Sequence, residues 1–337
     1  MILETASHAR AGLMGNPSDG YYGKTLSFTL TNFGAKVTLW ESPKVEFVHS
    51  PEDDSSFRDL DALLGEITLF GYYGGIRLLK ATTKVFVEYC REHGVSLPKR
   101  NFTACYESNI PRLVGMGGSS AICTAMFKAL VRFYEVKIPL PIIPTLCLNA
   151  ELQELDIQAG LQDRVVQTYG GVMFMDFDEK LVTTRGYGEY TRVPPKLLPP
   201  DLYIAYDAKR AEVSGRYHRS LRARFEQKDA KVMGAMKEFA RYAQEAYDAL
   251  LAGHLDALPG LINANFDLRD RIFNVSAANR RMVMVAREAG ASAKFTGSGG
   301  AIVGTYGNSE VYARLVAKLG TIGCQVFRPD IPDEKDE

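Results

Sequence analysis

A glycine-rich segment constrains this chain most. It reads Pro111-Arg-Leu-Val-Gly-Met-Gly-Gly-Ser-Ser-Ala121 and runs directly into a stretch that can form a helix. Glycine has no Cβ, so its backbone adopts positive φ readily and several N–H groups can point at one anion. The helix would add unpaired amides and the positive end of its dipole. The segment therefore predicts a phosphate-binding loop, although a glycine turn capped by serine would look alike.

Several residues of this segment are expected to contact phosphate: Pro111, Gly115, Gly117, Gly118, Ser119, Ser120 and Ala121. The two serines stand where a helix N-cap is favoured, and a hydroxyl there can cap the helix or ligate Mg²⁺ beside the phosphates. The Walker A ending Gly-Lys-Ser/Thr is missing, and no strand leads into a Gly-x-Gly-x-x-Gly turn. Neither a P-loop NTPase nor a dinucleotide fold is indicated.

Two more segments lie far from the first in sequence. They are Ala9-Arg-Ala-Gly-Leu-Met-Gly-Asn-Pro-Ser-Asp-Gly-Tyr-Tyr-Gly-Lys24 and Ala293-Lys-Phe-Thr-Gly-Ser-Gly-Gly-Ala-Ile-Val303. In order and spacing, the three segments resemble the three motifs of the GHMP kinases, the family of galactokinase, homoserine kinase, mevalonate kinase and phosphomevalonate kinase. Within that family, phrases such as Gly-Tyr-Tyr-Gly-Gly-Ile-Arg-Leu-Leu (71–79) and Ala-Gly-Leu-Gln-Asp-Arg-Val (159–165) most resemble the glucuronokinases. The similarity covers nearly the whole chain.

The resemblance implies an α+β fold of two domains with the site between them. Residues 1–193 would form an N-terminal domain like domain 2 of ribosomal protein S5, and residues 200–331 a ferredoxin-like C-terminal domain. The proline-rich residues 194–200 are the best candidate for a linker. Pattern alone indicates only an α+β chain with two lobes.

Periodicity and turn residues predict individual elements. In the first half these are paired strands within 24–40, a strand at 45–50, an acidic loop at 51–61, helices at 74–93, 121–134, 143–155 and 161–169, and a strand at 101–108. In the second half they are a strand at 202–207, long charged helices over 215–252 and 255–273, a helix at 277–289, a strand pair within 291–306, a helix at 310–319 and a strand at 325–328.

The resemblance also implies an activity. A sugar kinase of this kind would use ATP, with Mg²⁺ as cofactor, to phosphorylate the anomeric hydroxyl of D-glucuronate, giving glucuronate 1-phosphate and ADP. Two alternatives stay open: another sugar-1-kinase, acting on galacturonate or a galactose-like sugar, and a non-catalytic sensor of sugar and ATP on the same scaffold. A sensor would be expected to lack the catalytic aspartate, the magnesium-binding glutamate or the phosphate-loop serines, and this chain has candidates for all of them.

By the resemblance, Asp163 is the catalytic aspartate and Arg10 is the basic residue beside it. Asp163 would lie in the first turn of a helix after Gly160, where a carboxylate is stabilised. A guanidinium next to it would keep that carboxylate ionised and would offset charge on the transferred group. From local sequence alone, Asp163 could equally be a plain acid at a helix start, and Arg10 a surface residue at a strand edge.

For the metal, the resemblance points to Glu151, which precedes Asp163 by twelve positions as in galactokinase-like members. With Ser120 it would offer hard oxygen ligands to Mg²⁺, the other ligands being water and ATP phosphates. Ser119 could replace Ser120. Glu154 is the local competitor of Glu151.

Asn16, Ser18 and Asp19 occupy the segment where galactokinase holds its sugar hydroxyls. Galactokinase has an acidic residue and a histidine where this chain has Asn16 and Pro17, which argues against galactose. The carboxylate of a uronate would need a cation. Arg77 is favoured, with competitors Arg164, Lys24 and Lys294. The third glycine loop, with Gly297, Ser298 and Gly299, would close over the substrate, although a tight turn would also need these glycines.

The adenine is expected in an apolar slot near residues 37–40 and the segment before Pro111, where Trp40, Tyr72 and Tyr73 are equally candidates for core positions. Lys plus Arg and Asp plus Glu both number 40, so no nucleic-acid partner is indicated. No apolar run reaches membrane length and the N-terminus does not resemble a signal peptide, which predicts a cytoplasmic protein with no membrane partner. The 5 cysteines lack metal-ligand spacing and are expected to be reduced thiols.

Overall fold

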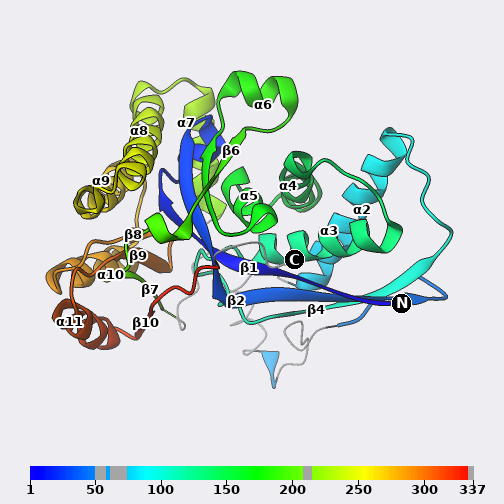
Figure 1. The fold of residues 1–337 in the computed structure, drawn as a ribbon, viewed down its shortest axis with the longest axis horizontal. Helices are drawn as coiled ribbons and strands as arrows, with labels where there is room; N and C mark the ends of the chain where they lie inside the picture. Colours follow the sequence, from blue (N-terminus) through cyan, green and yellow to red (C-terminus); the bar gives the residue numbers. More distant parts are fainter. Residues whose placement is uncertain (50–57, 61–73, 208–214, 333–337) are drawn as a thin grey trace.

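The computed structural model describes residues 1–49, 58–60, 74–207 and 215–332, which form two sheets with helices packed on them (Figure 1). The first sheet has six strands in the order β3-β4-β2-β5-β6, with β1 paired to β2. The second has four strands in the order β10-β7-β9-β8. The expected α+β fold is therefore confirmed.

The longest strands of the first sheet are β1 (Ile2–Met14) and β2 (Lys24–Ser42), which pair antiparallel from Ile2 opposite Trp40 to Met14 opposite Leu26. The other strands are β3 (Glu46–Phe47), β4 (Asn101–Ser108), β5 (Val172–Asp176) and β6 (Glu189–Val193). The prediction of two paired strands within 24–40 is wrong. The register shifts at His8 and Ala9, so residues 31–33 form a bulge in one strand rather than a turn between two.

Helices α2 (Gly75–Glu92), α3 (Gly118–Tyr134), α4 (Ile143–Leu155) and α5 (Leu161–Tyr169) lie together over one face of this sheet (Figure 1). Helix α6 (Glu179–Arg185) joins β5 to β6. Helix α3 is the innermost, since most of its side chains are buried against β1, β2 and the neighbouring helices. The burial of α3 fixes the position of the glycine loop from which it emerges.

The second sheet belongs to a ferredoxin-like unit. Its elements are β7 (Leu202–Asp207), α7 (Gly215–Glu226), α8 (Ala230–Ala252), α9 (Leu258–Ile272), α10 (Ala277–Glu288), β8 (Lys294–Phe295), β9 (Ala301–Thr305), α11 (Ser309–Gly320) and β10 (Cys324–Phe327). A strand, helices, two strands, a helix and a strand follow each other in the chain, and the fourth strand lies beside the first. This is the βαββαβ arrangement of ferredoxin-like folds.

Most predicted elements are confirmed within three residues, but two boundaries differ in an informative way. Helix α3 begins at Gly118, three residues before the predicted start. The predicted helix over 215–252 is two helices, because the side chain of Asp229 accepts hydrogen bonds from the amides of Lys231 and Val232 and so starts α8. Strands β1, β5 and β6 and helix α6 were not predicted.

Four short 3-10 turns complete the described chain: Ser18–Tyr21, Leu140–Ile142, Pro195–Leu197 and Leu255–Ala257. The predicted loop at 51–61, apart from 58–60, lies outside the described residues, as do Tyr72 and Tyr73. Cys90, Cys123, Cys147 and Cys324 are buried and Cys105 half-buried, all as free thiols. None of the helices in the described ranges is long and apolar enough to cross a membrane.

The two halves of the chain share one hydrophobic core. Helix α8 packs across β2, and its Tyr247 stacks on Phe174 of β5 with ring centroids 4.1 Å apart. After β10 the chain returns to the first sheet, where the amide of Thr31 donates to the carbonyl of Asp330 over 2.8 Å. The predicted domain boundaries, 1–193 and 200–331, remain a prediction, with β6 ending at Val193 and β7 beginning at Leu202.

Candidate active site

A cavity of about 700 Å³ lies where the three glycine segments meet. Its walls include Arg10, Asn16 and Asp19 from the first segment, residues 110–113 and 115–119 from the second, and Gly297 and Ser298 from the third. A cavity of this size is typical of small-molecule sites. The fold therefore brings together segments that are nearly 300 residues apart in sequence.

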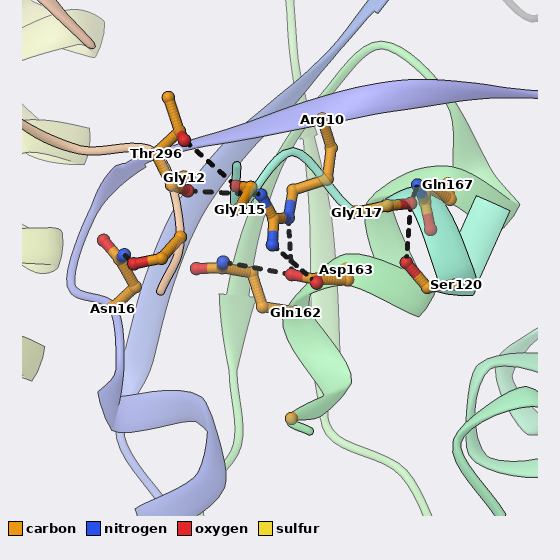
Figure 2. Close-up of polar contacts among 12 residues, drawn as sticks. Arg10, Gly12, Asn16, Gly115, Gly117, Ser120, Gln162, Asp163, Gln167 and Thr296 are labelled. Carbon is orange, nitrogen blue, oxygen red and sulfur yellow. Dashed lines mark hydrogen bonds and ion pairs between the residues drawn. The ribbon is translucent and has the colours of Figure 1, made fainter. Parts of the chain in front are cut away.

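The side chain of Arg10, on β1, is at the centre of this junction (Figure 2). Its Nε and Nη2 atoms donate to the two carboxylate oxygens of Asp163 over 2.5 and 2.6 Å. Its Nη1 atom donates to the carbonyl of Gly115 over 2.6 Å and to that of Thr296 over 3.3 Å. One buried guanidinium thus joins the acid of α5 to both other glycine segments.

Asp163 is ionised in this setting. Burial by itself would raise the pKa of its carboxyl group, but the charge and hydrogen bonds of Arg10 outweigh burial, and Arg164 and Gln162 add to the effect, so the pKa is lowered. The side chain is 19% exposed and lines the cavity. The site therefore presents a carboxylate that can accept a hydrogen bond from a bound hydroxyl.

The glycine loop 115–118 depends on backbone conformations that other residues rarely adopt. Gly115 has φ of 68° and Gly117 has φ of 76°, both in the left-handed region. Gly117 is the N-cap of α3, and its carbonyl accepts hydrogen bonds from the side chains of Ser120 over 3.0 Å and Gln167 over 2.8 Å (Figure 2). Gln167 also donates to the carbonyl of His8, so it ties this loop to β1.

The two loop serines differ in their contacts. Both stand inside the first turn of α3 rather than at its N-cap, because the helix begins at Gly118. The Ser120 hydroxyl is fully buried and hydrogen-bonded within its own turn. The Ser119 hydroxyl instead donates to Oε1 of Glu151 over 2.7 Å. The structure therefore brings Ser119, rather than Ser120, beside the expected metal carboxylate.

The other oxygen of Glu151 is held by Arg164. The Nε atom of Arg164 donates to Oε2 over 2.9 Å and Nη2 makes a second hydrogen bond to it, and both side chains are buried. Arg164 is thereby committed to Glu151 and is not available to a sugar carboxylate. Glu154 points elsewhere, to Lys84 over 2.6 Å.

Two of the three expected sugar-binding residues line the cavity. The side chain of Asn16 contacts the carbonyl of Gly297, and Asp19 accepts the amide of Gln162 over 3.1 Å. The Ser18 hydroxyl is fully buried and donates to the carbonyl of Lys24 over 2.9 Å. Ser18 therefore shapes the turn and does not reach the cavity.

Burial, with the negative charge of Asp163 nearby, raises the pKa of Asp19 to about 6. Two carboxylates therefore share this end of the cavity with different proton affinities. Asp163 is ionised at neutral pH, whereas Asp19 gains or loses its proton at about pH 6. Such a separation of pKa values is typical of functional sites.

The other candidate cations are placed differently. Lys294 is buried and donates to the carbonyls of Gly12 and Phe295 and to Oδ1 of Asn16, so it holds the backbone together. Lys24 pairs with Asp176. Arg77, in the first turn of α2, lines the cavity. Arg269 of α9, which sequence reasoning missed, also lines the cavity.

Two other expectations about the cavity walls need correction. Gly299 is not among the described lining residues, because it packs against Asn279, whose side chain accepts the amide of Gly300. Residues 37–40 are likewise absent from the lining among the described residues, since they pair with β1 and β4 in the middle of the sheet. The apolar wall beside the phosphate loop consists instead of Tyr106, Ile110 and Ile122.

Comparison with known proteins agrees with this geometry. Residues 77–171 match the model of the GHMP kinases N terminal domain. The chain is 46% identical to "Probable glucuronokinase 2" and 44% identical to "Glucuronokinase 1" of Arabidopsis thaliana, over 90% and 89% of this chain and 84% of each relative. Among solved structures, galactokinase of Lactococcus lactis in complex with galactose aligns with a TM-score of 0.77 at 15% identity, over 99% of this chain and 94% of that one.

The buried ion pair predicts a large stability effect. Replacing Arg164 with methionine leaves the Glu151 carboxylate buried without its cation, so the free energy of unfolding should fall by about 3–5 kcal/mol. Urea denaturation followed by circular dichroism measures this loss. The control is Arg241→Met, which removes an exposed arginine paired with Glu238 and Glu245 on α8 and should change stability little. An equal loss of unfolding free energy in Arg164→Met and Arg241→Met would contradict a stabilising role of the buried pair between Arg164 and Glu151.

The raised pKa of Asp19 predicts a pH effect on stability. In the folded protein Asp19 keeps its proton up to about pH 6, whereas in the unfolded chain it loses it near pH 4. The folded state therefore binds more protons in this window, and the Asp19 contribution to stability falls as the pH rises through it. Asp19→Asn cannot titrate, so its stability relative to the wild type should increase from about pH 4 to about pH 7. Urea denaturation across this range would show a constant difference if Asp19 had an ordinary pKa.

Proposed function

The chain belongs to the GHMP kinase family, and we propose that it transfers the γ-phosphoryl group of ATP to the anomeric hydroxyl of D-glucuronate, giving glucuronate 1-phosphate and ADP. The observation that carries this proposal is the Arg10–Asp163 pair, which stands between the phosphate loop and the Asn16–Asp19 turn. The similarity to the glucuronokinases of Arabidopsis thaliana supports glucuronate as the acceptor.

Asp163 acts on the acceptor hydroxyl. Its carboxylate accepts a hydrogen bond from the hydroxyl at C1 and orients the oxygen toward the γ-phosphorus. A carboxylate with a lowered pKa is a weak base, so the proton passes to Asp163 late, as the new O–P bond forms and the bond to the leaving oxygen of ADP breaks. Arg10 holds the carboxylate in place through both of its oxygens.

The phosphate loop positions the triphosphate. Positive φ at Gly115 and Gly117 and the N-terminus of α3 direct backbone amides into the cavity, where they would bind the β- and γ-phosphates. The positive end of the helix dipole and the Arg10 guanidinium would offset the negative charge of the transferred group. The adenine would extend along the apolar wall of Tyr106, Ile110 and Ile122.

Ser119 and Glu151 fit a magnesium ion. The Ser119 hydroxyl and Oε1 of Glu151 lie 2.7 Å apart at the start of α3, and both are the hard oxygen ligands that Mg²⁺ prefers. Arg164 holds Oε2 of Glu151, so Oε1, beside the Ser119 hydroxyl, is the oxygen that would bind the ion. When bound there with ATP, Mg²⁺ would neutralise charge on the phosphates. We also propose a cytoplasmic location, in keeping with the free thiols of all 5 cysteines.

The first kinetic prediction concerns Asp163. Replacing it with asparagine keeps the shape of the side chain but removes its charge, so kcat should fall by about 10²–10⁴-fold. Binding of ATP, measured by isothermal titration calorimetry, should be retained, and Asp163→Ala should behave alike. Asp248→Asn, on the exposed face of α8, serves as the control with unchanged turnover. Full activity in Asp163→Asn would contradict the proposed role of Asp163 in the reaction.

The second kinetic prediction concerns the acceptor. Coupled detection of ADP with glucuronate, galacturonate, galactose and glucose should give the highest kcat/KM for glucuronate. ADP release with galactose but not with glucuronate would make the protein a different sugar-1-kinase. Binding of ATP and sugar without turnover on any member of the panel would instead identify a sensor.

A further inference from the structure

We propose that Arg269 binds the carboxylate of the sugar acid and thereby sets the preference for a uronate over neutral sugars. This inference rests on the proposed function, because it names the residue that recognises the C6 carboxylate of its substrate. Arg269 lies on α9, in the C-terminal half of the chain, and lines the same cavity as the phosphate-loop residues.

Helix α9 forms hydrogen bonds with both the first and the third glycine segments, which surround the proposed sugar-binding end of the cavity. Asn265 and Arg269 are four residues apart and so lie on the same face of the helix. The Asn265 side chain accepts the amide of Gly15 over 2.8 Å and contacts the carbonyl of Asn16. Arg269 donates to the carbonyls of Gly297 and Ser298 over 2.9 and 3.1 Å. The guanidinium is therefore held in a fixed position between the first and third glycine segments.

Arg269 is a buried cation that forms no ion pair with the described residues. Its side chain is 4% exposed and packs on the rings of Phe273 and Phe295, with distances of 4.8 and 5.3 Å to the ring centroids. Among the described residues, no carboxylate forms an ion pair with it, and its hydrogen bonds are the two to Gly297 and Ser298. A guanidinium has five N–H donors, so three remain for a ligand.

The electrostatics agree with this geometry. Burial lowers the pKa of Arg269 to about 10, and the nearby Asp19 and Tyr21 offset only part of the cost. A buried charge of this kind is normally paired. A carboxylate in the cavity would supply the missing charge and could accept two parallel hydrogen bonds from the planar guanidinium.

The position of Arg269 also suits a sugar whose C1 hydroxyl meets Asp163. Arg10, which holds Asp163, bonds to the carbonyl of Thr296, and Arg269 bonds to the carbonyl of the next residue, Gly297. Consecutive Cα atoms are about 3.8 Å apart, so the two anchors lie within the span of one small ligand. Asn16, from the sugar segment, contacts the same Gly297 carbonyl.

The remaining cations are less suited. Arg77, which the sequence favoured, lines the cavity from the first turn of α2, whereas Arg269 is anchored to the Gly297 carbonyl that Asn16 also contacts. Arg222 also lines the cavity, but its side chain is 47% exposed, pairs with Glu226 and donates to the carbonyl of Gly20. Arg269 therefore combines burial, a missing anion and closeness to the sugar segment.

The test compares glucuronate with glucuronamide, the neutral C6 amide of the same shape. The wild type should prefer glucuronate, and Arg269→Gln should reduce this preference in kcat/KM by about 10- to 100-fold, since a hydrogen bond to a charged group is lost. The loss should fall on the KM for glucuronate and leave the KM for ATP unchanged. Arg269→Lys, which keeps the charge without the planar fork, should recover part of the preference.

Two matched variants make the test selective. Arg222→Gln removes another arginine of the same cavity and should leave the preference for glucuronate over glucuronamide unchanged. Arg77→Gln tests the position favoured by the sequence and should also leave it unchanged. Thermal melts of each variant establish that it is folded.

The outcomes separate this inference from the proposed function. An equal loss with glucuronate and glucuronamide in Arg269→Gln would mean that Arg269 only supports the Gly297–Ser298 backbone, which would overturn the inference and leave the kinase assignment intact. A collapse of the preference in Arg77→Gln alone would overturn it in favour of Arg77. Failure of the wild type to phosphorylate glucuronate at all would overturn the proposed function, and the inference with it.

Discussion

The rest of the site depends on the buried ion pair between Arg10 and Asp163. A buried charge is tolerated only when it is paired and hydrogen-bonded, and each of these two side chains satisfies the other through two short hydrogen bonds. The remaining guanidinium donor is used by the carbonyls of Gly115 and Thr296. The hydrogen bonds of this one arginine therefore connect three segments that are distant in sequence, and the cavity lies around their junction.

The two halves of the chain contribute unequally to this cavity. The N-terminal half supplies Asp163, the glycine loop 115–118 and Glu151, all positioned by helices α3, α4 and α5 over the first sheet. The C-terminal half supplies the 296–298 loop and the α9 face with Asn265 and Arg269. The shared hydrophobic core, including the stacked pair Phe174–Tyr247, holds the halves in contact. In the proposed function, the N-terminal half would therefore bind most of the phosphates, and both halves would contact the sugar.

Much of the fold could be predicted from the sequence. Helices α4 and α5 have the predicted bounds, and the resemblance to a known family pointed to Arg10 and Asp163. Strand β5 and the second half of β1 (9–14) were missed because strands buried on both sides lack the alternation that marks a half-exposed strand.

The finer geometry of the site could not be predicted in the same way. Which loop serine meets Glu151 depends on the start of α3 at Gly118, and helix ends are the least certain part of a sequence pattern. Arg269 was missed because an arginine on a helix usually faces water, and its burial depends on contacts with residues 297 and 298, which only the tertiary structure brings to it.

The two buried ion pairs of the site have a consequence for its internal geometry. Asp163 and Arg164 are neighbours in the first turn of α5, and the first pairs with Arg10 while the second pairs with Glu151. Both ion pairs therefore start from one peptide unit, whose Cα atoms stand about 3.8 Å apart. Because Arg10 lies on β1 and Glu151 on α4, the two pairs hold the first turn of α5 between a strand and a second helix. In the proposed reaction, a shift of this turn would displace the carboxylate that meets the sugar hydroxyl and the carboxylate beside the phosphates together.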